Sequence, residues 1–148
     1  NEGGHYDAIM LLEPSSPFAT PDHMAKAIDL YQSRAAELVV GMRRTETPSL
    51  FVGEQTHDDS IADIVENMRA APKQRRQDQP GEWTMNGALY LVSWEAFKRS
   101  GKIYGAAENS YGLLMDRWHS LEIETPDDLL LAEFAVANGM IDLSSWRS

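Results

Sequence analysis

The chain of 148 residues has no cysteine, which excludes disulfide bonds, thiolate nucleophiles and zinc sites built on cysteine. It also lacks an apolar run long enough to span a membrane and a basic-then-apolar leader, so we expect a soluble, cytoplasmic protein without a membrane partner. Basic residues are scarce, with 13 Lys and Arg against 23 Asp and Glu and a formal net charge of −10. Because binding to nucleic-acid phosphates needs clustered Lys and Arg, we expect no nucleic-acid partner.

The composition favours one globular domain over residues 1–148, since 43% of the residues are hydrophobic and can form a core. The sequence begins with Asn1 rather than Met, and we expect it to be a fragment or a processed form.

Apolar runs bounded by polar residues and turn formers predict the strands. Residues 6–12 and 38–42 are two such runs. Between them, Thr20 and Pro21 mark a helix start, and an apolar stripe follows at helical spacing. A strand, a helix and a second strand predict a right-handed crossover and a largely parallel sheet. Further strands are predicted at residues 85–92, 113–115 and 121–124, and a short helix at residues 93–98 that Gly101 ends.

The middle of the chain differs in character. Residues 43–79 are polar and contain only a predicted helix at residues 60–71 and a short apolar run at residues 50–52. We interpret residues 43–85 as an arm inserted into the connections of the sheet. The predicted fold is therefore α/β, with three layers (α/β/α), a mostly parallel (mixed) sheet and this arm.

Two glutamates, Glu122 and Glu124, stand two residues apart in the last predicted strand, directly before a helix start marked by Thr125 and Pro126. The strand period places both carboxylates on one face, at the carboxyl end of the strand, where open α/β sheets bind their ligands. The alternative is that both are ordinary solvent-facing residues, which are favourable beside a helix N-terminus.

Four separated segments carry a family resemblance. They are the turn Glu13-Pro14-Ser15-Ser16-Pro17-Phe18-Ala19, the pair Arg76-Gln77, the run Asn86-Gly87-Ala88-Leu89-Tyr90, and Ser120-Leu121-Glu122-Ile123-Glu124-Thr125 with its acidic, Leu-rich helix. In this order and spacing they resemble the motifs of the acylneuraminate cytidylyltransferases, the CMP-sialic acid synthetase type, and of relatives that act on other nonulosonic acids. The resemblance runs from about residue 6 to residue 139.

The resemblance implies a nucleotide-diphospho-sugar transferase-like fold in which the arm forms a homodimer. It implies transfer of CMP from CTP to a nine-carbon sugar acid, with release of pyrophosphate. Mg²⁺ is the implied cofactor, held by Glu122 and Glu124 where the family has paired aspartates. The implied substrate-binding residues are Glu13, Arg76, Gln77, Asn86, Gly87 and Ala88.

The chain departs from the family pattern in several places. It has no counterpart of the glycine- and lysine-rich loop that wraps the triphosphate, so we expect negligible CMP transfer by residues 1–148 alone. Glu122 and Glu124 are each longer than aspartate by about 1.5 Å. Glu13 replaces a glutamine, which turns an amide donor into a pure acceptor. The alternative function is therefore a non-catalytic dimeric module that binds a sugar acid or another partner.

Other polar residues receive a plainer interpretation. Ser15 and Ser16 have no neighbouring base and are predicted to form a turn. The four histidines have no metal-ligand spacing and are predicted to be surface residues: His5, His23, His57 and His119.

Overall fold

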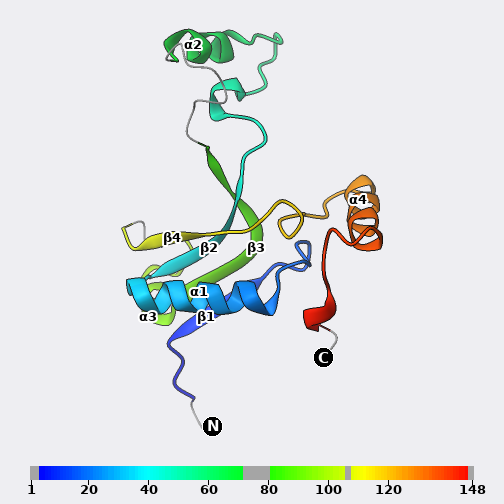
Figure 1. Ribbon diagram of the computed structural model, residues 1–148. Helices are drawn as coiled ribbons and strands as arrows, with labels where there is room; N and C mark the ends of the chain where they lie inside the picture. The colour runs from blue at the N-terminus through cyan, green and yellow to red at the C-terminus, as the bar shows by residue number, and fades with distance from the viewer. Residues whose placement is uncertain (1–3, 72–80, 106–107, 147–148) are drawn as a thin grey trace. The chain divides into compact units, whose positions relative to one another are not determined.

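The computed structural model describes residues 4–71, 81–105 and 108–146 (Figure 1). These residues form a four-stranded sheet with the strand order β1-β3-β2-β4. The α/β class predicted from the sequence is confirmed, because helices connect and cover the strands. The strands are β1 (Ala8–Leu12), β2 (Leu38–Arg44), β3 (Trp83–Ser93) and β4 (Ser110–Leu114).

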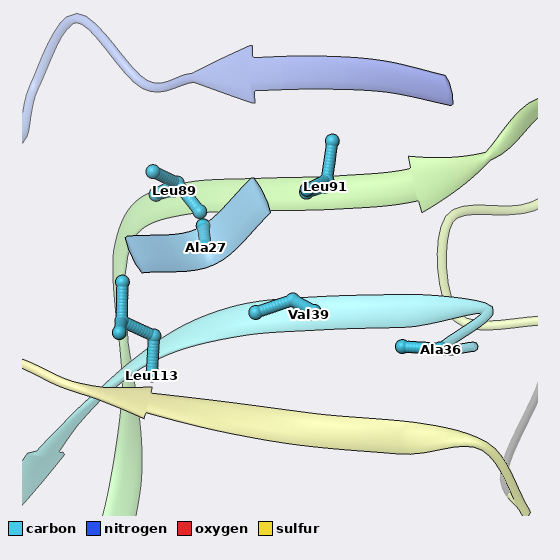
Figure 2. Close-up of a cluster of buried hydrophobic side chains, with 6 residues drawn as sticks. All are labelled: Ala27, Ala36, Val39, Leu89, Leu91 and Leu113. Carbon is cyan, nitrogen blue, oxygen red and sulfur yellow. The ribbon is translucent and has the colours of Figure 1, made fainter. Parts of the chain in front are cut away.

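The sheet is mixed. β1 pairs with β3 in antiparallel orientation, whereas β2 pairs with β4 in parallel orientation. The start of β2 meets the end of β3, since the backbone N–H of Ser93 donates to the carbonyl of Glu37 at 2.8 Å. Farther along β2, Gly41 lies against Asn86, so β3 also runs antiparallel to β2. The other three strands therefore share one direction, and β3 runs against them (Figure 2).

Two long helices begin where the sequence predicts. α1 (Pro21–Arg34) and α4 (Pro126–Ala137) each follow a threonine N-cap and have proline in the first turn. In α4, the Thr125 hydroxyl accepts the N–H of Asp128 at 3.3 Å, and the Asp128 carboxylate accepts the N–H of Thr125 at 2.8 Å. This capping box keeps the pKa of Asp128 below its ordinary value, through hydrogen bonds from the Thr125 side chain and from backbone N–H groups.

The short helix α3 (Trp94–Ser100) is confirmed and is slightly longer than predicted. The Ser93 hydroxyl accepts the N–H of Ala96 at its start. Gly101 ends it with a left-handed φ of 67°.

The predicted strand at residues 121–124 is wrong, because this segment pairs with none of the four strands. The backbone N–H of Ile123 donates instead to the carbonyl of Ser15, at 2.8 Å. The predicted alternation survives, since Leu121 and Ile123 pack against the α4 region while Glu122 and Glu124 are exposed.

The main core lies between α1 and the sheet (Figure 2). Ala27 of α1 faces Val39 of β2 and Leu89 of β3, and all three are fully buried. On the opposite face, Val40 and Val92 pack with Phe97 of α3. Helices therefore lie on both faces of the sheet in the described part of the chain.

A second apolar cluster joins α4 to the segments around it. Phe18, Ala132, Ala135 and Ile141 are its buried members. The indole N–H of Trp146 donates to the carbonyl of Ala19 at 3.1 Å. This cluster fixes the start of α4, and with it the segment that carries Glu122 and Glu124.

The chain divides into two compact units, residues 1–43 with 85–148, and residues 44–84. The second unit contains η1 (Ser49–Phe51) and α2 (Ala62–Ala70), where the sequence predicts an apolar run and a helix. Within it, the Glu82 carboxylate accepts hydrogen bonds from the backbone N–H and the hydroxyl of Ser49, at 2.6 and 2.8 Å. None of the described helices is both long and apolar enough to cross a membrane.

Core packing predicts the effect of two leucine truncations. Leu89 is fully buried, whereas the side chain of Leu130 on α4 is 62% exposed. Leu89→Ala should lower the free energy of unfolding by about 2–5 kcal/mol, because it removes buried methyl groups and leaves a cavity. The matched Leu130→Ala should change it by about 0.5 kcal/mol or less. Urea denaturation of both variants checks this, and equal losses would contradict the assignment of the core.

Candidate active site at the carboxyl edge of the parallel strands

β1, β2 and β4 share one direction, so their carboxyl ends lie at one edge of the sheet. The turn that begins at Glu13 follows β1, and the segment that begins at Met115 follows β4. β3 reaches this edge beyond the end of β1, because the β1–β3 ladder stops at Leu12 and Leu89. Ligands of open α/β sheets bind at such an edge.

Asn86 is the central buried polar residue at this edge, with 2% of its surface exposed. Its amide N–H₂ donates to the hydroxyl of Ser120 at 2.9 Å and to the sulfur of Met115 at 3.2 Å. Its amide oxygen accepts the backbone N–H of Ala88 at 3.1 Å. Both amide hydrogens are therefore used inside the protein, and Asn86 joins β3 to the segments after β4. Its predicted contact with substrate stays a prediction.

Gly41 of β2 makes room for Asn86. A Cβ atom at position 41 would lie 2.5 Å from the Asn86 side-chain oxygen. Ala88 is also fully buried and packs with Ala19 and Met115. These neighbours place the Asn86-Gly87-Ala88 run at the edge through close packing.

Gly87 brings β3 close to two other motif segments. Its φ of 68° is left-handed, and β3 bends beside Leu89 (Figure 2). A Cβ atom at position 87 would lie 3.1 Å from a carboxylate oxygen of Glu122 and 3.3 Å from the hydroxyl oxygen of Ser16. The Ser16 hydroxyl donates to the carbonyl of Asn86 at 3.4 Å. Gly87 thus lets the Glu122 carboxylate lie directly over the backbone of β3.

Glu122 and Glu124 are exposed and precede α4. The backbone N–H of Glu124 donates to the Asp128 carboxylate at 3.2 Å, which connects this residue to the α4 cap. In the described residues no His, Cys, Asp or Glu joins these two carboxylates in a cluster of three.

Glu13 begins the turn that reaches the Glu122 segment, since its carbonyl accepts the N–H of Ser16 at 3.0 Å and the carbonyl of Ser15 accepts the N–H of Ile123 at 2.8 Å. Burial raises the pKa of Tyr90 to about 12, assisted by a hydrogen bond with Tyr104 and by the negative charges of Glu13 and Glu122. Tyr90 therefore stays neutral over the physiological pH range. Two further predicted binding residues, Arg76 and Gln77, lie outside the described residues.

A histidine pair lies near the start of α1. The rings of His23 and His119 meet edge to face, with centroids 5.1 Å apart, and a ring nitrogen of His119 lies 2.6 Å from the Asp116 carboxylate. His23 is buried, so its predicted surface position is wrong, whereas His5 and His57 are exposed as predicted. His23 occupies the third helical position of a capping box, which is the local signal that sequence reasoning missed.

The environment shifts the pKa values of this group. Burial lowers the pKa of His23, and the nearby His119 lowers it further. Burial alone would raise the pKa of Asp116, but hydrogen bonds from the backbone and ring of His119 and from the Trp118 N–H hold it below its ordinary value.

No family model matches the chain. An N-acylneuraminate cytidylyltransferase from Escherichia coli O18:K1:H7 is 27% identical over 128 residues, which are 86% of this chain and 29% of that protein. N-acylneuraminate cytidylyltransferase A from Danio rerio is 26% identical over 127 residues, 86% of this chain and 28% of that protein.

The chain is a relative of the N-acylneuraminate cytidylyltransferases. The resemblance predicted from the four segments is thereby confirmed. The chain spans less than a third of the length of the curated relatives that it matches.

The Gly87 geometry predicts unequal effects of two glycine substitutions. Gly87 and Gly101 have nearly the same left-handed φ, but a Cβ atom at Gly101 would meet nothing within 4 Å. Gly101→Ala should therefore cost about 1–2 kcal/mol of stability from backbone strain alone. Gly87→Ala should cost about 1–3 kcal/mol more, because it also crowds Glu122 and Ser16.

A double-mutant cycle isolates that crowding. Adding Glu122→Ala to Gly87→Ala should recover part of the lost stability, whereas adding it to Gly101→Ala should recover none. Urea denaturation of the parent and of the single and double variants gives the coupling free energy of Glu122 with each glycine position. Equal coupling free energies at positions 87 and 101 would contradict the contact between Gly87 and Glu122.

The lowered pKa of His23 predicts a pH dependence. Below pH 6.5, the ordinary value for histidine, the unfolded chain binds a proton at this residue more readily than the folded chain does. The stability associated with neutral His23 is thus present above pH 6.5 and is lost as the pH falls through the folded pKa. His23→Gln can keep the capping box without titrating. In metal-free buffer, thermal unfolding from pH 7 to pH 5 should show a smaller loss for this variant than for the parent.

Proposed function

We propose that this chain forms part of a cytidylyltransferase that transfers CMP from CTP to a nonulosonic sugar acid of the sialic type. The observation that carries the proposal is the convergence of three motif segments far apart in sequence. Ser16, Gly87 and Glu122 come together at the carboxyl edge of the parallel strands. The names of the two curated relatives supply the reaction and the substrate class.

In the proposed reaction, the anomeric hydroxyl of the sugar acid attacks the α-phosphorus of CTP, and the bond to pyrophosphate breaks. The proton of the hydroxyl passes to water, and negative charge gathers on the leaving pyrophosphate. Such transfers depend on positioning and on charge neutralisation more than on covalent chemistry. An edge where several segments are fixed by buried hydrogen bonds suits this requirement.

Glu122 and Glu124 are the proposed ligands of Mg²⁺. Both offer exposed carboxylate oxygens, and Mg²⁺ prefers one or two carboxylates together with phosphate oxygens and water. The two carboxylates are therefore ligands of the chemical type that Mg²⁺ prefers. The absence of a side chain at Gly87 leaves the space that the longer Glu122 occupies. When bound, Mg²⁺ would neutralise phosphate charge.

Glu13 is better suited to the sugar than to the triphosphate. A carboxylate accepts hydrogen bonds from hydroxyl groups but repels phosphate oxygens. Glu13 lies directly after β1, in the turn whose Ser15 carbonyl accepts the N–H of Ile123 beside Glu122. We therefore assign Glu13 to hydroxyl groups of the ribose or of the sugar acid.

The activity is tested with the complete gene product that contains this sequence. It should release pyrophosphate from CTP in the presence of N-acetylneuraminic acid and Mg²⁺. Glu122→Gln should lower kcat/KM by on the order of 10²-fold, because loss of the carboxylate charge would displace the ion and with it the phosphate that the ion positions. Glu133→Gln, an exposed glutamate on α4, is the matched control and should keep full activity. Absence of pyrophosphate release with any nonulosonic acid would favour the non-catalytic module instead.

Ligand-dependent stability tests the metal ligands separately. Without ligands, Glu122→Ala and Glu124→Ala should each change the free energy of unfolding by about 0.5 kcal/mol or less, since both residues are exposed. Mg²⁺ with CTP should raise the Tm of the parent and leave the Tm of both variants unchanged. An equal rise in all three proteins would place the ion elsewhere.

The second unit supports a homodimer. α2 has no buried residue, although Ile61, Val65 and Met68 recur at helical spacing before and along it and are 62%, 37% and 50% exposed. Such a stripe is typical of a helix that packs against a partner. We therefore propose that residues 43–85 form the dimer contact, as the family resemblance implies.

Light scattering tests this contact. The parent should be a dimer at micromolar concentration, and Val65→Glu with Met68→Glu should make it a monomer by placing charge in the apolar stripe. Asn67→Glu adds a charge on another side of α2 and should leave the dimer intact. A monomeric parent would refute the proposal.

A further inference from the structure

We propose that His23, Asp116 and His119 bind a transition-metal dication of the Zn²⁺ type, at a site separate from Glu122 and Glu124. One potential ligand atom from each of the three residues lies within 4.8 Å of the other two. In the described part of the chain this is the one group of three His, Cys, Asp or Glu residues with that geometry.

The three residues come from two segments. His23 stands in the first turn of α1, whereas Asp116 and His119 belong to the loop that follows β4. His23 is 9% exposed, and the side chains of His119 and Asp116 are 19% and 56% exposed. The site is thus buried on the helix side and open to solvent on the carboxylate side, which gives an ion a path to enter.

The donor set selects the class of metal. Two imidazoles and one carboxylate suit Zn²⁺, Co²⁺ or Ni²⁺, whereas Mg²⁺ prefers oxygen ligands alone. Two nitrogen ligands of one tetrahedral Zn²⁺ ion, at about 2.0–2.1 Å each, lie within about 3.5 Å of one another. The ligand atoms, which lie within 4.8 Å of one another, would therefore need to move only slightly closer to share one ion. Three protein ligands would leave a fourth position for water or another ligand.

The Asp116 carboxylate is already oriented for this task. One of its oxygens accepts the backbone N–H groups of Trp118 and His119, at 2.9 and 3.1 Å. The other oxygen contacts the His119 ring. These hydrogen bonds hold carboxylate and imidazole side by side, and the oxygen that contacts the ring keeps a further lone pair for an ion.

Thr20 couples the tautomer of His23 to the N-cap of α1. The Nδ1 atom of His23 accepts the backbone N–H of Thr20 at 3.1 Å and lies 2.9 Å from its hydroxyl oxygen. In this state the ring proton is on Nε2. A metal bound through Nε2 would leave the ring proton on Nδ1, which would donate to the Thr20 hydroxyl oxygen, and the backbone N–H of Thr20 would lose its acceptor. Metal binding would thus exchange the backbone bond of the capping box for a bond to the N-cap hydroxyl.

A bound ion would join the start of α1 to the loop after β4. That loop leads to Ser120, which accepts a hydrogen bond from Asn86. The metal would therefore stiffen the edge of the sheet where the candidate active site lies, without itself contacting the reacting groups.

The test uses the tag-free protein in metal-free buffer, titrated with Zn²⁺ by calorimetry and with Co²⁺ by visible absorption. We expect one equivalent to bind. His119→Ala should weaken binding by at least about tenfold, and His57→Ala, an exposed histidine, is the matched control that should change nothing. Circular dichroism confirms that each variant is folded. The double variant Glu122→Gln with Glu124→Gln should bind Zn²⁺ like the parent, which separates this site from the proposed Mg²⁺ ligands.

Thr20 variants test the tautomer. Thr20→Val should weaken Zn²⁺ binding, whereas Thr20→Ser should restore it. Nitrogen chemical shifts of the histidine rings give an independent measurement on the parent, in which His23 and His119 should shift and His5 should not. A parent that binds Zn²⁺ no more tightly than His119→Ala, with unchanged ring shifts of His23 and His119, would overturn the proposal.

Discussion

The hydrogen bonds of one buried amide, Asn86, hold the candidate site together. This side chain joins β3 to Ser120 and Met115 and accepts the N–H of Ala88. A buried amide without partners would be strongly unfavourable, so these contacts are a condition of the fold as well as of the site. They also explain why β2 carries glycine at position 41, since any side chain there would displace the amide.

Capping residues and helix-ending glycines predicted the helices from the sequence alone. Thr20 and Thr125 with their following prolines indicated both long helix starts, and Ser93 with Gly101 bounded α3. These features need only residues a few positions apart, because a helix satisfies its hydrogen bonds within itself. The α/β class followed from the same reasoning, since apolar runs alternated with helical patterns.

Features that depend on distant partners were not predictable in the same way. The alternation around Ile123 indicated a strand, yet its N–H bonds to Ser15, more than a hundred positions away. His23 appeared to be a surface residue because its neighbours, Asp116 and His119, are equally remote in sequence. The family resemblance directed attention to the segments that carry Gly87 and Glu122, but only the fold shows that these two residues lie side by side.

Two different donor sets stand near one edge of this sheet. Glu122 and Glu124 offer only oxygen, whereas His23 and His119 add nitrogen. Since oxygen-rich sites favour hard ions and imidazoles favour borderline ones, the two proposed sites would differ in the ion that they prefer.

The bond between Ile123 and Ser15 has a kinetic consequence. It joins residues more than a hundred positions apart, so its closure costs more loop entropy than a local contact does. Contacts of such high sequence separation form slowly and depend on the rest of the fold. We therefore expect the edge that gathers Ser16, Gly87 and Glu122 to form late in folding. Solvent exchange of the Ile123 amide hydrogen would report the opening of the whole site rather than the fraying of one loop.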